Sequence, residues 1–161
     1  AGINVGLGTD STATGSVNIL EEMRFARDIY RKMYGEELAP RTVVNMVTVN
    51  PAKAFRLQKE TGYLAEGKLA DVLVIRQRKD DPWESLVGMR PEDIELLIQD
   101  GSPIYGDARH EELFSARGVQ YTTVGVKGRE MLVKGDPAGL LERVRKAVGF
   151  QKVLDFIPLD T

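Results

Sequence analysis

The period of the hydrophobic pattern changes near Gly62, and this change limits most strongly the folds open to the chain. Before it, apolar residues recur every three or four positions, most clearly over residues 17–34, which is typical of an amphipathic helix. After it, short β-favouring runs alternate with turn residues. The pattern predicts an α+β fold, with residues 1–61 mainly helical and residues 62–161 mainly strand, closed by a C-terminal helix.

Caps and turns place the predicted elements more closely. Ser16 or Asn18 can cap the first long helix, and Gly35 ends it where a residue with positive φ is usual. The polar residues 76–84 are predicted as a surface loop. We expect strands over residues 2–7, 72–75, 94–99 and 103–105 and on both sides of Lys127-Gly128, and we expect the strand 72–75 to be buried. We expect helices over residues 17–34, 40–47, 50–57 and 108–116 and from Pro137 onward. Asn50 is the predicted cap of the helix 50–57.

Composition excludes several classes of function. The 161 residues carry a formal net charge of −2, which gives no reason to expect binding to nucleic acid or to an anionic membrane. No run approaches the roughly 18 apolar residues of a membrane span. Cysteine is absent, which excludes disulfides and thiolate metal sites and fits a cytoplasmic protein. His110 is the single histidine, so no multi-histidine metal site is possible within the chain, and its polar surroundings favour a surface position.

The opening stretch GINVGLGTDSTATGS places Asp10 just after the expected strand 2–7. Spacing alone leaves two interpretations open for Asp10: it caps a turn or the next helix, or its carboxylate serves a site. A third possibility is that the small residues hold a phosphate at the helix N-terminus, although neither a P-loop nor a dinucleotide motif is present. The expected strand is separated from the others by about fifty largely helical residues, so it either joins the later sheet or belongs with strands of a longer protein.

A set of ordered motifs resembles the C-terminal end of an amidohydrolase-superfamily enzyme of the chlorohydrolase and cytosine-deaminase-like branch. The motifs are GLGTDS, SVNILEEMRFA, NPAKAFRL, TGYLAEGKLADVLVI and LLIQDGSPIYGD. The resemblance covers roughly residues 2–133 and implies a fold. Residues 1–61 would end a (β/α)₈ metal-dependent hydrolase barrel, and residues 62–161 would form a β-sandwich-like subdomain.

The resemblance also implies roles for residues in the first loop. Asp10 would lie at the C-terminal end of the last barrel strand, where such barrels assemble their active sites. There it would bind a divalent metal, zinc or iron, and take a proton from the attacking water. Ser11, Thr12 and Ser16 would line the mouth through which substrate enters.

The remaining ligands of the family are histidines that this chain lacks. We therefore expect the chain to bind no metal and to be inactive by itself, with the N-terminal barrel portion as its missing partner and a cyclic small molecule as substrate. Apolar faces left open without that portion would also permit a homo-oligomer. The alternative function is that of a non-catalytic β-sandwich module for folding support or subunit contact.

Overall fold

The computed structural model describes residues 2–11 and 14–150, and the chain forms two compact units. Unit 1 comprises Ala1–Leu69 and Ile75–Asp93, and unit 2 comprises Ala70–Val74 and Ile94–Thr161. Each unit buries apolar side chains of its own. Within the described ranges, no helix is both long enough and apolar enough to cross a membrane.

The longest helix of unit 1, α1 (Ile19–Tyr34), forms where the helical spacing predicted it. Asn18 is its N-cap, because the Asn18 Oδ1 atom accepts a hydrogen bond from the Glu21 amide at 3.0 Å. Gly35 ends the helix with φ of 71°, as predicted. Of the two candidate caps, Asn18 is therefore correct, and Ser16 is left for another contact.

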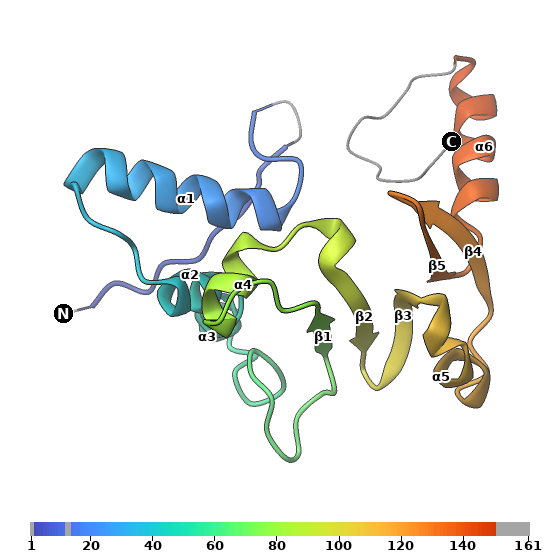
Figure 1. Cartoon of the computed structure of the whole chain (residues 1–161), viewed down its shortest axis with the longest axis horizontal. Coiled ribbons are helices and arrows are strands. Elements are labelled where there is room, and N and C mark those ends of the chain that lie inside the picture. The colour runs from blue at the N-terminus through green and yellow to red at the C-terminus, as the bar shows by residue number, and fades with distance from the viewer. Residues whose placement is uncertain (1, 12–13, 151–161) are drawn as a thin grey trace. The chain divides into compact units, whose positions relative to one another are not determined.

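Three shorter helices complete unit 1: α2 (Pro40–Val47), α3 (Val49–Ala54) and α4 (Pro82–Gly88), seen beside α1 in Figure 1. The prediction of Asn50 as the cap of α3 is wrong. Thr48 takes the N-cap position because α2 leads almost directly into α3. The buried apolar side chains of unit 1 are Leu20, Met23, Val43, Ala52, Val87 and Met89.

Helix α4 begins inside the segment that was predicted as a surface loop. Asp81 caps it by accepting a hydrogen bond from the Trp83 amide at 2.8 Å, and Pro82 occupies its first turn. Val87 is only 1% exposed, so even this short helix contributes to the core of unit 1. The loop prediction is wrong from Pro82 onward, because the Asp-Pro capping signal outweighs the polar composition around it.

Residues 2–7 do not form the predicted strand. They run beside α2 and α3, where the Leu7 amide donates to the Met46 carbonyl at 3.0 Å and the Asn50 side chain donates to the Val5 carbonyl at 2.8 Å. A β-strand needs a neighbouring strand to share its ladder of hydrogen bonds. Within the described residues no strand pairs with this segment, so its backbone groups bond to helical partners instead.

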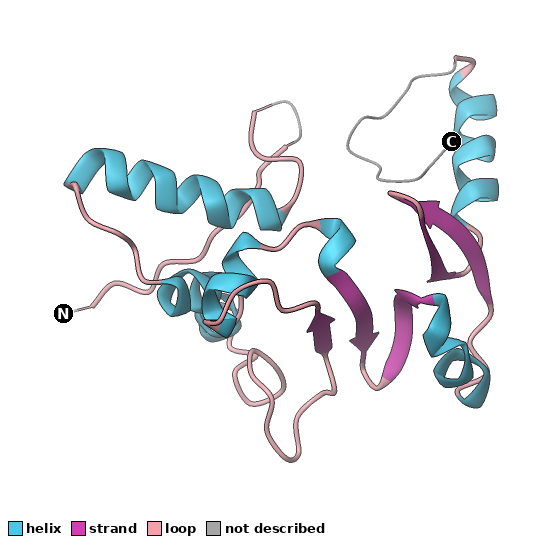
Figure 2. Ribbon diagram, viewed as in Figure 1, coloured by secondary structure: helices cyan, strands magenta, loops and turns pink. Residues whose placement is uncertain are grey.

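Unit 2 is built on a five-stranded sheet in the order β1-β2-β3-β5-β4, shown in Figure 2. The pairs β2–β3, β3–β5 and β4–β5 are antiparallel. The predicted turns at Asp100-Gly101 and Lys127-Gly128 are confirmed, and both residues of each turn have positive φ, as type I′ hairpins require. The strands are β1 (Val72–Ile75), β2 (Ile94–Gln99), β3 (Ser102–Asp107), β4 (Tyr121–Val126) and β5 (Arg129–Lys134).

Two apolar clusters stabilise unit 2. Leu96, Phe114 and Leu132 form the first, in which α5 (Glu111–Ala116) contributes the fully buried Phe114. The second cluster contains Val124, Val126 and Met131 from β4 and β5. Unit 2 also contains the helix predicted from Pro137, α6 (Pro137–Val148). The chain is therefore a mixed α/β protein with a largely antiparallel sheet, as the change of period indicated.

Strand β1 is less buried than predicted. Leu73 is 38% exposed and Val74 is 41% exposed. The reason is topological, because β1 lies at one edge of the sheet and has a neighbour on one side only within the described residues. A continuous apolar run is typical of a strand covered on both faces, but it does not reveal whether the covering elements are present.

Candidate functional site

The loop that carries Asp10 turns sharply before α1. Asp10 itself has φ of 54°, in the left-handed region that aspartate tolerates better than most residues, and its side chain is exposed. Its Oδ2 atom accepts a hydrogen bond from the Thr14 hydroxyl at 3.0 Å. Within the described part of the chain, Oδ1 accepts none. One oxygen of the carboxylate is thus held by Thr14, and the other has no hydrogen-bond partner among the described residues.

Ser11 lies in the same network. Its Oγ atom is 2.8 Å from the Thr14 hydroxyl oxygen, and its backbone carbonyl accepts hydrogen bonds from the amides of Thr14 and Gly15 at 3.1 and 2.7 Å. Ser11 and Asp10 are therefore brought together through Thr14. Thr12, the second residue expected at the substrate mouth, lies outside the described residues.

Ser16 makes a different contact from the other two candidates. Its hydroxyl donates to Glu22 Oε2 at 2.7 Å, and the bond is partly buried at the start of α1. This hydrogen bond ties the end of the loop to the first helical turns. Ser16 thus makes a contact within unit 1, and its place at a substrate mouth stays a prediction.

The N-terminus of α1 is a poor place for a phosphate. Asn18 already satisfies the Glu21 amide, one of the donors that an anion would use. Glu21 and Glu22 stand in the first turn, where their carboxylates complement the positive end of the helix dipole. A phosphate would meet two negative charges there, so the phosphate-cradle alternative is disfavoured by the structure.

The described residues do not form a complete metal site. Among them, no group of three or more histidine, cysteine, aspartate or glutamate side chains could hold a metal ion. His110 belongs to unit 2, in a 3₁₀ turn (Ala108–His110) before α5, whereas Asp10 belongs to unit 1. Asp10 fits the part of a single ligand, because it is exposed and has an oxygen to offer, but structural or catalytic zinc takes at least three protein ligands.

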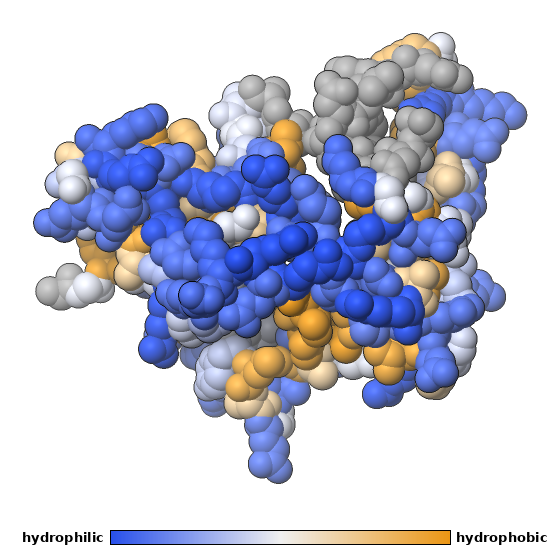
Figure 3. Space-filling view, viewed as in Figure 1, coloured by the Kyte–Doolittle hydropathy of each residue, from blue (hydrophilic) through white to orange (hydrophobic). Residues whose placement is uncertain are grey.

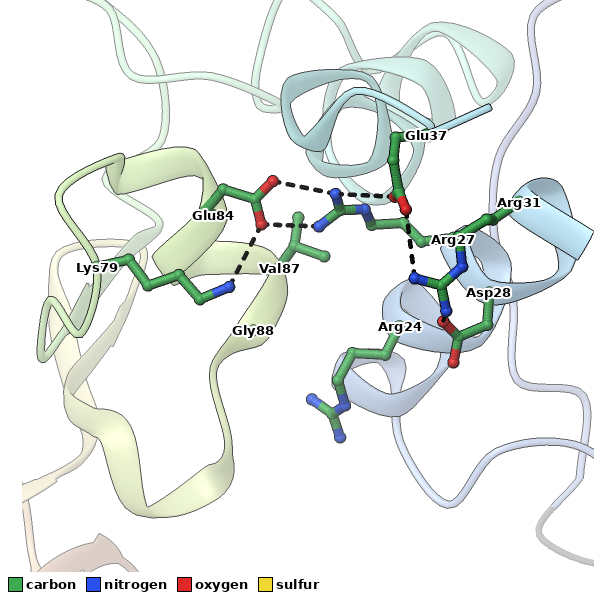
Figure 4. A pocket seen from close by; sticks show the side chains of 9 residues that line it. All are labelled: Arg24, Arg27, Asp28, Arg31, Glu37, Lys79, Glu84, Val87 and Gly88. Carbon is green, nitrogen blue, oxygen red and sulfur yellow. Dashed lines mark hydrogen bonds and ion pairs between the residues drawn. The ribbon is translucent and has the colours of Figure 1, made fainter. Parts of the chain in front are cut away.

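Unit 1 also has a charged cavity of about 360 Å³, shown in Figure 4. Arg27 of α1 donates to both carboxylate oxygens of Glu84 of α4, at 2.8 and 3.0 Å, and also contacts Glu37. Arg31 pairs with Glu37 and with Asp28. Arg27 and Arg31 are thus paired with neighbouring carboxylates, and the cavity is an ion-paired junction between α1 and α4.

The pairing with Arg27 makes the stability of unit 1 depend on pH. The hydrogen bond from Arg27 is the main reason that the pKa of Glu84 lies below its ordinary value of 4.5. A carboxyl whose pKa is lowered by folding stabilises the fold above its unfolded pKa, and this contribution is lost as the pH falls through the folded pKa. We expect Glu84→Gln to lower the free energy of unfolding by about 1 kcal/mol at pH 7, since the pair is partly exposed to solvent.

Chemical denaturation of the two proteins between pH 7 and pH 3 measures this effect. The difference between them should shrink as the pH falls below 4.5. Glu37→Gln is the matched control, because Glu37 contacts the same guanidinium from a side chain that is 55% exposed, and its effect should be smaller. An equal loss in both variants, or a difference that does not shrink as the pH falls below 4.5, would contradict the assignment.

Two contacts of unit 1 were not predicted from the sequence. Thr14 lies between residues that were expected to line a substrate mouth, but it was not linked to Asp10 from the sequence. A hydroxyl residue four positions after an aspartate, in a loop of small residues, could have indicated this hydrogen bond. The Arg27–Glu84 pair joins residues 57 positions apart, and no local pattern reports such a contact.

Comparisons with known proteins agree with the resemblance in the motifs. A sequence model of the amidohydrolase family matches residues 1–128. The chain is 27% identical over 139 residues to the 5-methylthioadenosine/S-adenosylhomocysteine deaminase of Moorella thermoacetica, which covers 84% of this chain and 28% of that protein. It is 37% identical over 114 residues to the enzyme of the same name from Thermococcus kodakarensis, covering 63% of this chain and 26% of that protein.

A differently named relative matches a similar length of the chain. The 5'-deoxyadenosine deaminase of Methanosarcina acetivorans is 34% identical over 118 residues, which covers 67% of this chain and 27% of that protein. The chain thus spans little more than a quarter of the length of the curated relatives that it matches. Most of its own length is matched, including the Asp10 loop, unit 1 and the first four strands. The chain therefore belongs to the amidohydrolase family.

Proposed function

We propose that this chain forms the C-terminal part of a metal-dependent amidohydrolase that hydrolyses a carbon–nitrogen bond of a cyclic small molecule. The observation that carries the proposal is the Asp10 carboxylate, exposed with one oxygen held and one open, in a chain matched to this family over residues 1–128. Relatives are named as deaminases of 5-methylthioadenosine, S-adenosylhomocysteine or 5'-deoxyadenosine. An adenosine derivative modified at its 5' position is therefore the proposed substrate class.

Deamination of such a base needs an attacking water and a departing amine. A divalent metal, zinc or iron, would supply the acidity that makes water nucleophilic near neutral pH. Asp10 would be one ligand of that metal and would accept the proton that the attacking water loses, then return it to the leaving nitrogen. Thr14 holds Oδ2 of the carboxylate, and Oδ1, which has no hydrogen-bond partner among the described residues, would be the atom that does this.

The other ligands would come from outside the described residues, since among those residues no group of three or more histidine, cysteine, aspartate or glutamate side chains could hold a metal ion. In this proposal residues 1–61 end the barrel, and residues 62–161 belong to a β-sandwich-like subdomain. Residues 2–7 pair with no strand among the described ones, and neighbouring barrel strands would supply those partners. The proposed division into two domains is an inference from the motifs.

Exposed apolar side chains on unit 1 support the proposal that another polypeptide segment packs against it. Helix α1 buries Leu20 and Met23, but Phe25 and Met33 are 55% and 66% exposed, and Ile3 before the helix is 88% exposed. In Figure 3, orange apolar areas interrupt a mainly hydrophilic surface. Apolar side chains left open in this way favour association, with the N-terminal barrel portion as the proposed partner and a second copy of the chain as the competing one.

A titration with metal tests the proposal on the chain itself. With one carboxylate ligand, we expect the 161-residue chain to bind zinc or iron(II) no better than about 1 mM and to show no hydrolysis. Isothermal calorimetry measures the affinity, and Asp10→Asn should lower it further, because the substitution removes the one ligand. Micromolar affinity, or turnover by the chain alone, would contradict the proposed incomplete site.

The alternative is a non-catalytic β-rich module that supports folding or subunit contact. The upstream coding sequence discriminates between the two. A His-x-His motif after a strand, roughly 250 to 350 residues before Asp10, would decide for the hydrolase, because a barrel of this class needs about that length. Absence of histidine ligands there would favour the module.

A further inference from the structure

We propose that Thr14 is a positioning residue that holds the Asp10 carboxylate, and that Gly15 makes this arrangement possible. The inference rests on the proposed function, in which Asp10 is a metal ligand and proton acceptor. It concerns only contacts within the described part of the first loop. In this proposal Thr14 donates a hydrogen bond to Asp10, Ser11 donates one to Thr14, and Gly15 allows the loop to close.

Counting protons fixes the direction of the hydroxyl network. An ionised carboxylate only accepts hydrogen bonds, so the Thr14 hydroxyl must donate its single proton to Asp10 Oδ2. Thr14 then has no proton left for Ser11, and the 2.8 Å contact between the two hydroxyl oxygens requires Ser11 to be the donor. The chain of hydrogen bonds runs from Ser11 to Thr14 to Asp10. A donor that itself accepts a hydrogen bond is polarised and becomes a stronger donor.

Because the hydrogen bonds run from Ser11 to Thr14 to Asp10, only one oxygen of the Asp10 carboxylate is engaged by this network. Thr14 occupies Oδ2, whereas Oδ1 accepts no hydrogen bond within the described residues. A hydrogen bond to the second oxygen of a ligating carboxylate fixes its orientation, which is the usual role of residues behind a metal ligand. Thr14 would act in this way without touching metal or substrate.

Gly15 is required because the loop closes on itself there. A Cβ atom at Gly15 would lie 1.8 Å from the carbonyl oxygen of Thr9 and 2.8 Å from its carbonyl carbon. Both atoms are backbone, so no side-chain rotation relieves the clash. Any larger residue must push the Thr9 carbonyl away, and with it the peptide that leads into Asp10.

The backbone supports the same geometry. The Ser11 carbonyl accepts from the Thr14 amide and the Gly15 amide, which draws the two ends of the loop together. Asp10 keeps φ of 54° in this closed form. A residue keeps a left-handed backbone conformation when the contacts around it stabilise that conformation. For Asp10 these contacts are the close packing of Gly15 against the Thr9 carbonyl and the hydrogen bond from the Thr14 hydroxyl.

The first test measures the orientation of Asp10 and needs no metal and no activity. In the 161-residue chain, three-bond couplings from the Asp10 Cγ atom to its backbone nitrogen and carbonyl carbon report the χ1 rotamer. We expect one staggered rotamer in the wild type and in Thr14→Ser, which keeps the hydroxyl. Thr14→Val, which keeps the shape but removes the donor, should give averaged couplings, and Gly15→Ala should shift the Asp10 backbone resonances.

Thr42→Val is the matched control, because Thr42 is an exposed threonine in α2 of the same unit. It should leave the Asp10 couplings unchanged. Unaltered couplings in Thr14→Val, with the fold retained by circular dichroism, would overturn the proposal. This result is independent of whether the protein is a hydrolase.

The second test uses the chain joined to its barrel portion. Thr14→Val should weaken metal binding or lower kcat by about 10- to 100-fold, as loss of an outer hydrogen-bond partner does, and Thr14→Ser should restore most of the effect. If Asp10→Asn itself has no effect, the proposed function fails. If Asp10→Asn has a large effect but Thr14→Val has none, only the positioning role fails.

Discussion

In the proposed hydrolase, in which the chain is joined to its barrel portion, replacing Asp10 with asparagine is expected to lower kcat/KM by about 10²- to 10⁴-fold, the range that a positioned general base contributes. Asparagine keeps the shape of the side chain and still accepts a hydrogen bond from Thr14 through its carbonyl oxygen. It cannot take a proton from water at neutral pH, and it brings no negative charge to a metal. The loss should therefore be chemical and not conformational.

Steady-state kinetics with 5'-modified adenosines, together with metal content measured on the same samples, test this expectation. Asp28→Asn is the matched control, because Asp28 is an exposed aspartate of unit 1 whose contact is a surface ion pair with Arg31. Its variant should keep near wild-type kinetics. Full activity of Asp10→Asn would remove Asp10 from the site and with it the main support for the proposed function.

The sequence predicted the structure well where one hydrophobic period continued through a whole helix or strand. Helix α1 begins and ends at its capping residues, Asn18 and Gly35, because those side-chain and backbone preferences are local. The two hairpins of unit 2 were equally readable, since Asp100-Gly101 and Lys127-Gly128 favour turns whatever surrounds them.

Predictions failed where structure depends on distant partners. Alternation over residues 2–7 favours a strand, but a strand exists only if another strand pairs with it, and the described residues bond the Leu7 amide to a helix carbonyl instead. Leu73 and Val74 read as buried, yet β1 is an edge strand of this sheet. At the candidate site, the family motif indicated Asp10, but the link from Thr14 appears only when the loop is seen closed over Gly15.

A buried group of charges crosses the sheet of unit 2. Glu95 of β2 is 5% exposed and forms ion pairs with Arg109 and with Arg129, whose Nη2 lies 3.2 Å from Glu95 Oε1. Arg129 also pairs with Asp107 of β3. Burial opposes ionisation of Asp107, but the hydrogen bonds from Arg129 and from the Arg109 amide outweigh it, so its pKa lies below the ordinary value. The group links β2, β3 and β5, and the pairing favours the charged form of Asp107.

Glu95→Gln is expected to lower the free energy of unfolding of unit 2 by about 3 kcal/mol, because removing one partner leaves the buried side of Arg129 without half of its compensating charge. Asp107 remains beside Arg129, which keeps the loss at the lower end of the range for buried pairs. Glu130→Gln is the matched control, because Glu130 is an exposed glutamate of β5, and it should change stability by less than about 0.5 kcal/mol. Urea unfolding followed by the side-chain NMR signals of Tyr105 and Tyr121 reports on this sheet, and equal midpoints for the two variants would show that Glu95 carries no buried charge interaction.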